Sequence, residues 1–373
     1  MSGETPARRN ARAAPALARG CALGQRTGVA PLRRLARLAL AVLLAAGAAA
    51  APLAAPLAAQ AAPPAGRVVA DTFWSAALRT RKQFVVYLPP SYDREPARRY
   101  PVAYYLHGLW GNEWNWVRQG GLATVMDSLV AAGGPEMLVV MPDGDDSWYT
   151  TWNALVTAAD CQRDTVRREP AASYCVPWPH YDDYLARDLV ARVDSQYRTR
   201  AERARRGIAG LSMGGYGATS LALRYPDVYA AAASHSGVLA PLLVSAGPFD
   251  AARPPRYAAT PDTLARRWRN YWTTIPVAFG RDTAGWWARD PGRLAARLNA
   301  RDPRRMPALS IDVGVDDYTR DQNRALHFTL DSLGVPHRYA EWPGAHDWAY
   351  WRAHVGESLA WLGARLAGAG AAP

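Results

Sequence analysis

Ser212 lies between two glycines in the segment Gly210-Leu211-Ser212-Met213-Gly214. A G-x-S-x-G sequence between a strand and a helix is typical of a sharp turn that exposes a serine hydroxyl for nucleophilic attack. An apolar run at 207–211 precedes the serine and a helix-like segment at 216–225 follows it, which is the context that this turn requires. A serine hydroxyl is a weak nucleophile, so it needs a histidine as base and a carboxylate that orients the histidine.

The base is expected among five histidines that follow the serine: His235, His327, His337, His346 and His354. His346 is the predicted base, because it lies in a Pro/Gly-containing loop directly after an apolar strand-like run at 338–342. His327 lies on a helical face and His337 opens a strand, so both are predicted to be structural. His235 follows the strand after the serine turn and is a candidate substrate contact.

The carboxylate of such a triad is expected at the end of the apolar run 308–313. Asp316 and Asp317 both follow that run, and Asp316 is the predicted acid. Asp317 is the second choice. Asp312 is a third, less favoured because it lies inside the strand and fits a buried carboxylate bonded to neighbouring amides.

Acyl transfer also needs hydrogen-bond donors for the developing oxyanion. The backbone N–H of Met213, the residue after the serine, is one predicted donor. Leu109 is the other, because the apolar run 101–106 ends in His-Gly-Leu-Trp-Gly, a loop of the type that supplies the second N–H. His107 in this loop is interpreted as a packing residue, with a catalytic role as the alternative.

Several tryptophans fall on predicted loops at the carboxyl ends of strands, which suggests an aromatic-walled cleft. Tryptophans scattered through the core or surface are the alternative. The predicted substrate contacts are Trp110, Trp148, Trp152, His235 and Trp348.

Seven apolar runs alternate with segments of helical spacing, which indicates an α/β fold with a mostly parallel central sheet and helices on both faces. The runs are 83–88, 101–106, 137–141, 207–211, 229–234, 308–313 and 338–342. Two segments break the alternation. Residues 143–180 are expected to form an ordered loop, and 240–302, rich in arginine, proline and aromatics, a cap-like insertion near the site.

The first 61 residues have the composition of an export signal. A basic segment precedes an apolar Leu/Ala run, and Ala59-Gln60-Ala61 fits a cleavage site. Residues 62–69 are then a linker, 70–366 the catalytic domain and 367–373 a disordered tail. Export without stable membrane insertion is expected. An uncleaved anchor is the alternative, weakened by Pro52 and Pro56 within the run.

The formal charge of +12 overstates how basic the domain is. Residues 1–61 hold eight of the 44 basic and one of the 32 acidic residues, so the rest carries about +5 without charge blocks. Nucleic-acid binding requires a clustered basic face, so no nucleic-acid partner is expected.

Two cysteines remain after residue 61, Cys161 and Cys175. An even pair in an exported chain predicts one disulfide. No Cys/His cluster of metal-ligand spacing surrounds them, so no metal site is expected. The serine chemistry requires no cofactor.

Together these motifs resemble the esterase D and mycolyltransferase branch of the α/β-hydrolases, which also holds feruloyl esterases. The matching segments span residues 70–365: Val86–Tyr92, Tyr100–Gly108, Met141–Gly144, Gly210–Gly217, Ser236-Gly237, Gly344–Trp348 and Trp351-Arg352. The resemblance implies an α/β-hydrolase fold, Ser212 and His346 in catalysis, an acid within 314–317, and the amides of Leu109 and Met213 as the oxyanion hole.

The expected activity is hydrolysis of a small-molecule or carbohydrate-linked ester, with aryl and acetyl esters as candidate substrates. Acyl transfer to a sugar or an envelope lipid would use the same residues. A non-catalytic binding module on the same fold is the second alternative.

Overall fold

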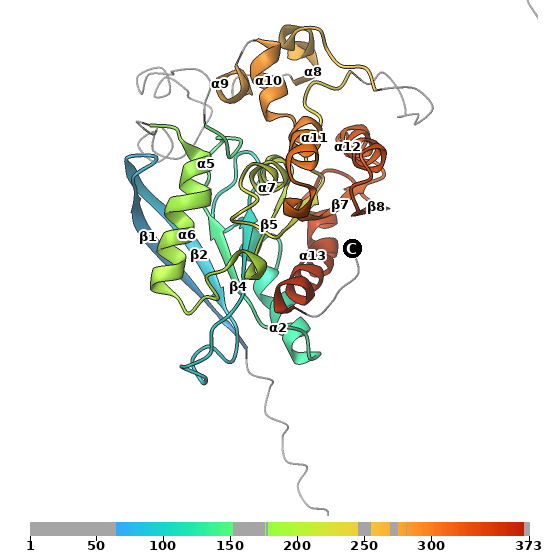
Figure 1. Cartoon of the computed structure of the whole chain (residues 1–373). Coiled ribbons are helices and arrows are strands. Elements are labelled where there is room, and N and C mark those ends of the chain that lie inside the picture. Colours follow the sequence, from blue (N-terminus) through green and yellow to red (C-terminus); the bar gives the residue numbers. More distant parts are fainter. Residues whose placement is uncertain are drawn as a thin grey trace, which may run out of the picture. The chain divides into compact units, whose positions relative to one another are not determined.

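A sheet of eight strands organises the described part of the chain, in the order β1-β2-β4-β3-β5-β6-β7-β8 (Figure 1). The computed structural model describes residues 65–151, 176, 178–244, 255–268, 275–280 and 282–368. The predicted presequence at 1–61, Trp152, Cys161, Cys175 and residues 369–373 therefore lie outside the described residues.

The strands are β1 (Arg67–Ser75), β2 (Thr80–Leu88), β3 (Val102–Leu106), β4 (Leu138–Pro142), β5 (Arg206–Leu211), β6 (Ala231–His235), β7 (Ala308–Gly314) and β8 (His337–Trp342). Each of the seven apolar runs overlaps one of β2 to β8. The sequence analysis missed β1, an edge strand with several exposed residues and so a weak apolar signal. Because β1 begins at Arg67, the folded domain starts inside the range predicted as a linker.

Strand direction places the carboxyl ends of β5, β7 and β8 at one edge of the sheet. β1 pairs antiparallel with β2 and β2 with β4, whereas the pairs from β4 through β8 are all parallel. Ser212, Asp317 and His346 follow β5, β7 and β8 respectively. Parallel neighbours end at the same edge, so the three residues can meet there.

Alternation along the strands divides the core between the two faces of the sheet. In β3, Tyr104 belongs to one buried cluster and Tyr105 to the other. Residues of α6, α7, α11 and α12 complete the first cluster, and residues of α2 and α13 complete the second. Successive side chains point to opposite faces of a strand, so a sheet covered on both sides needs such continuous apolar runs.

The helices are α1 (Asn115–Arg118), α2 (Leu122–Ala131), α5 (Tyr181–Asp183), α6 (Leu189–Gln196), α7 (Met213–Arg224), α8 (Ala265–Trp268), α9 (Ile275–Phe279), α10 (Thr283–Arg289), α11 (Pro291–Arg301), α12 (Arg320–Ser332) and α13 (Trp348–Ala367). A π-helical turn, η1 (Tyr184–Asp188), joins α5 to α6, and short 3₁₀ turns are η2 (Arg203–Arg205), η3 (Pro261–Leu264) and η5 (Pro303–Arg305). None of the described helices combines the length and apolar character needed to cross a bilayer.

The insertion predicted at 240–302 contributes α8 to α11, which lie together in Figure 1. Phe279 at the end of α9 contacts Trp286, Tyr216 and Trp148, and α11 packs against α7. The described part of the insertion is therefore attached to α7, the helix that begins immediately after Ser212.

Candidate active site

Ser212 occupies the strained turn between β5 and α7. Its backbone has φ 53° and ψ −116°, in a region that side-chain-bearing residues rarely adopt. The flanking glycines are required by close contacts: a Cβ on Gly210 would lie 2.4 Å from the Gly214 backbone, and a Cβ on Gly214 would lie 2.4 Å from the Leu106 carbonyl oxygen. The G-x-S-x-G spacing therefore permits a turn that presents the Ser212 hydroxyl at the strand end.

A continuous chain of hydrogen bonds links Ser212 to His346 and Asp317. The Ser212 Oγ lies 2.9 Å from His346 Nε2, and His346 Nδ1 lies 2.9 Å and 3.0 Å from the two carboxylate oxygens of Asp317. If Nδ1–H donates to the carboxylate, Nε2 is left as acceptor for the serine proton, which is the tautomer that general-base catalysis needs. The structure thus brings together the predicted nucleophile and the predicted base.

The carboxylate in this hydrogen-bond chain belongs to Asp317 and not to Asp316, the predicted acid. Asp316 is exposed, whereas Asp317 is buried and hydrogen-bonded to His346. The Asp316 N–H donates to the Gly344 carbonyl and the Asp317 N–H to the Gly314 carbonyl. This turn after β7 directs the second carboxylate, rather than the first, toward the histidine.

Asp317 is held in its ionised form by its neighbours. The Thr319 N–H and hydroxyl donate to its Oδ1 at 2.7 Å and 2.8 Å. Burial alone would raise the pKa of Asp317, but hydrogen bonds from His346 and from the Thr319 amide, with the histidine's charge, outweigh burial and lower it. The carboxylate is thus fixed both in position and in charge.

Two aromatic rings contact the His346 imidazole. The Tyr318 ring lies 4.3 Å from it, centre to centre, and the Trp351 ring meets it edge-on at 5.0 Å. The sequence analysis missed Tyr318 as a site residue. Its position directly after the acid was the available signal. These contacts restrict the rotation of the imidazole.

The loop that carries Leu109 approaches the serine closely. A Cβ on Gly108 would lie 2.6 Å from the Leu211 side chain. The buried His107 accepts the Gly144 N–H at Nε2, 2.9 Å away, so its Nδ1–H donates to the Gly108 carbonyl at 2.8 Å. Asp146 accepts the Trp110 N–H at 2.7 Å. These contacts support the packing interpretation of His107 and set the position of the Leu109 amide.

A buried cluster of charges lies beneath that loop. Lys82 Nζ lies 2.6 Å from Asp143 and 2.8 Å from Asp145, and its side chain is 1% exposed. Burial alone would lower the pKa of Lys82, but the two carboxylates outweigh it and raise the pKa. Since Asp143 and Asp145 flank Gly144, the cluster fixes the segment that holds His107.

A cavity of about 240 Å³ opens beside the Ser212 hydroxyl. Leu109, Trp110, Tyr318, Trp348 and Trp351 are among the residues that line it. Trp110 and Trp348, two of the predicted substrate contacts, thus line the cavity. None of the described residues of 240–302 lines this cavity, and the described part of the insertion packs on α7.

Two other predicted substrate contacts are corrected. Trp148 is buried and packs against Tyr216 and Phe279 in the core. His235 is 0% exposed, so it cannot touch a substrate that enters from the cavity. Trp148 follows β4 and His235 is the last residue of β6, and both side chains are buried in the protein interior.

His235 instead belongs to a buried hydrogen-bond network that the sequence analysis did not identify. Its Nδ1 lies 2.8 Å from Asp312 Oδ2 and its Nε2 lies 2.8 Å from the Ser358 hydroxyl. The Tyr350 hydroxyl donates to Asp312 at 2.8 Å, and the Tyr105 hydroxyl lies 2.9 Å from that of Ser358. Asp312 is thereby satisfied within the fold, but by a histidine ring and a tyrosine hydroxyl rather than by the neighbouring amides that the structural interpretation expected.

Comparison with known proteins gives consistent relatives. Residues 75–362 match the model of the family described as "Putative esterase". An endo-1,4-beta-xylanase/feruloyl esterase of Xylanibacter ruminicola is 29% identical over 44% of this chain and 20% of its own length. Esterase Rv1288 of Mycobacterium tuberculosis is 26% identical over 74% of this chain and 54% of its own. The chain thus spans about a fifth of the length of the first relative and about half of the length of the second.

A solved structure of a ferulic acid esterase superposes with a TM-score of 0.60, at 25% sequence identity, and covers 81% of this chain and 99% of the other. The eight-stranded, mostly parallel sheet agrees with that similarity, and the resemblance to the esterase and mycolyltransferase branch of the α/β-hydrolases is confirmed. The match over residues 75–362 includes every strand from β2 to β8, and the chain belongs to this esterase family.

Proposed function

We propose that this protein is a serine carboxylic-ester hydrolase in which Ser212 is the nucleophile, His346 the base and Asp317 the orienting acid. The observation that carries the proposal is the unbroken Ser212–His346–Asp317 hydrogen-bond chain beside an open cavity. Such a chain activates a serine for attack on an ester carbonyl.

The reaction proceeds in two steps. His346 Nε2 takes the proton as Ser212 Oγ attacks the ester carbonyl carbon, and the backbone N–H groups of Leu109 and Met213 stabilise the oxyanion. His346 then donates that proton to the leaving alcohol as the acyl-enzyme forms. Water, deprotonated by His346, attacks the acyl-enzyme and releases the acid and Ser212.

Cavity size and lining favour a compact acyl group. The volume of about 240 Å³ lies below the roughly 300–1,000 Å³ of sites for drug-sized ligands. Tyr318, Trp348 and Trp351 offer ring faces and edges that suit an aryl acyl group. The names of two relatives include feruloyl or ferulic acid esterase, which supports aryl or carbohydrate-linked esters over transfer of a long lipid acyl chain.

Export is part of the proposal. The basic and then apolar segment in residues 1–61 supports removal of a presequence near Ala61. The pair Cys161 and Cys175 would form a disulfide in an oxidising compartment.

Hydrolysis of p-nitrophenyl acetate, butyrate, octanoate and ferulate by the purified protein tests the activity. We expect the highest kcat/KM on acetate or ferulate, and loss of turnover in Ser212→Ala, with Ser195→Ala on the exposed end of α6 as the matched control. Adding a sugar acceptor separates hydrolysis from acyl transfer, because transfer yields a sugar ester. Absence of turnover on every ester would leave a binding module as the better explanation.

A further inference from the structure

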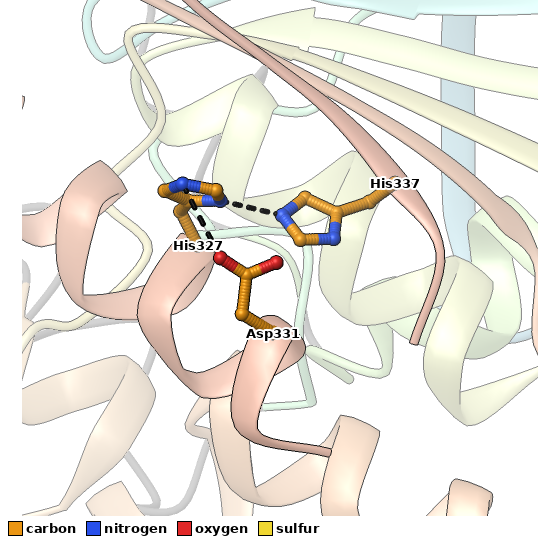
Figure 2. A group of neighbouring side chains, drawn as sticks. All are labelled: His327, Asp331 and His337. Carbon is orange, nitrogen blue, oxygen red and sulfur yellow. Dashed lines mark hydrogen bonds and ion pairs between the residues drawn. The ribbon is translucent and has the colours of Figure 1, made fainter. Parts of the chain in front are cut away.

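His327, Asp331 and His337 gather away from the cavity, on the last turns of α12 and the first residue of β8 (Figure 2). One possible ligand atom from each of the three lies within 4.8 Å of the others. His327 and Asp331 are four residues apart, so they share one face of the helix. None of the three lines the cavity beside Ser212.

The two imidazoles are oriented by contacts of their own. His337 Nδ1 lies 2.8 Å from the Val335 carbonyl, so Nδ1–H donates there and the Nε2 lone pair points away from the backbone, toward His327. The His327 ring stacks on Tyr339 at 4.2 Å with planes 3° apart. Histidines that ligate metals are commonly held in this way, with the second ring nitrogen donating to a carbonyl.

The contact between the two imidazoles is compatible with a shared ion, whereas Asp331 lies beside the other nitrogen of His327 and would have to turn. His327 Nδ1 lies 2.7 Å from His337 Nε2, and His327 Nε2 lies 3.5 Å from the Asp331 carboxylate. Two nitrogens bound to one tetrahedral Zn²⁺ at about 2.0–2.1 Å are about 3.3 Å apart, so the rings would separate by a few tenths of an ångström. Asp331, 62% exposed at its side chain, has the freedom to turn toward the ion.

We propose that His327, Asp331 and His337 bind one divalent transition-metal ion of the zinc class, with water completing the coordination. Two imidazoles and one carboxylate suit Zn²⁺, Co²⁺ or Ni²⁺, whereas Mg²⁺ and Ca²⁺ prefer oxygen ligands. Both histidines were predicted to be structural, His327 from its helical face and His337 from its place at the start of a strand. Their proximity is hidden in the sequence, because ten residues separate them and the packing of α12 beside β8 brings them together.

The site acts on stability rather than on the reaction itself. Asp317 precedes α12 and His346 follows β8, so the ion would join the two elements that lie between the acid and the base. An ion that binds only the folded chain raises the thermal midpoint with its concentration. The reaction at 25 °C should proceed equally with and without the ion.

Isothermal titration calorimetry of the EDTA-treated, tag-free full-length protein with ZnCl₂ tests the proposal. We expect one Zn²⁺ per chain, a thermal midpoint several degrees higher in excess Zn²⁺, and no shift with MgCl₂. His327→Gln and His337→Gln should each weaken binding by about 10-fold or more, since even outer-shell partners contribute about 10–100-fold. His354→Gln is the matched control, because His354 pairs with Glu357 on α13 without a third ligand.

Co²⁺ absorption identifies the ligands independently of whether the variants fold. Weak visible bands without a sulfur-to-metal charge-transfer band would support the proposed nitrogen and oxygen ligands. A charge-transfer band would assign the ion to cysteine and overturn the proposal. No Zn²⁺ binding by the wild-type protein, or equal binding by folded His327→Gln and His337→Gln, would overturn it as well.

Discussion

The backbone carbonyl of His235 accepts the N–H of Ser212 at 2.9 Å. The nucleophile turn is thus tied to the end of β6, where the His235 side chain bonds to Asp312 and Ser358. His346–Asp317 and His235–Asp312 are histidine–aspartate pairs from neighbouring strand ends, the first beside the cavity and the second with a fully buried histidine. The buried pair supports the backbone that carries the serine.

Asp312→Asn tests this supporting role. His235 Nδ1 lies 2.8 Å from Asp312 Oδ2 and 3.0 Å from Oδ1, and the Tyr350 hydroxyl donates to Oδ1. Whichever oxygen becomes the NH₂ group of asparagine, that group faces a donor. Leaving a buried donor unsatisfied costs about 1–3 kcal/mol, so we expect the free energy of unfolding in urea to fall by that amount. Asp316→Asn, on the exposed turn, is the control, and equal unfolding midpoints for the two variants would contradict the role.

Asp317→Asn should lower kcat/KM far more than Asp316→Asn. An asparagine at 317 cannot stabilise the imidazolium and favours the wrong tautomer of His346, an effect on the order of 10³–10⁴-fold in comparable triads. Asp316→Asn changes an exposed side chain and should leave the rate near that of the wild type. The assay is p-nitrophenyl acetate hydrolysis, and a larger loss in Asp316→Asn would restore Asp316 as the acid.

Lys82→Met should destabilise the fold strongly. It leaves Asp143 and Asp145 buried together without their cation, and removing one partner from a buried ion pair costs about 3–5 kcal/mol. Guanidinium unfolding monitored by tryptophan fluorescence measures the change. Arg67→Met removes an exposed ion pair with Asp93 and should have little effect. Similar midpoints for both variants would show that the buried cluster contributes no more than an exposed pair.

Asp290 should make stability fall as pH rises from about 4 to 7. It is buried at the start of α11, where it accepts the Arg293 N–H, and burial raises its pKa from 3.8 to about 6. The pKa of such an acid is higher in the folded chain than in the unfolded chain. Its contribution to the free energy of unfolding is fully present below the unfolded pKa and is lost as the pH rises through the folded pKa.

Asp290→Ser keeps a capping oxygen and removes the ionisable group. The variant's stability relative to the wild type should therefore rise between pH 4 and 7, by at most about 3 kcal/mol. Urea unfolding at pH 4.5 and pH 7.5 measures this difference. Parallel changes in both proteins would show that Asp290 has no raised pKa.

The sequence predicted the elements well because buried parallel strands require continuous apolar runs. It also identified Ser212 and His346, whose motifs depend on local geometry. It favoured Asp316 over Asp317, whose carboxylate is the one bonded to His346, because the two residues differ only in the direction that one turn gives them. The burial of Trp148 and His235 depends on packing against α9 and α13, and residue type alone does not encode such contacts.

β8 is the outermost strand of the sheet, bonded on one side only to β7, and several of its residues are partly exposed. The serine is attached to β5 in the interior of the sheet, whereas the base depends on this border strand. Local unfolding of this edge strand would displace the base while the nucleophile stayed in place. On heating, catalytic activity should consequently disappear at a lower temperature than the bulk of the secondary structure, and it should return on cooling from that range.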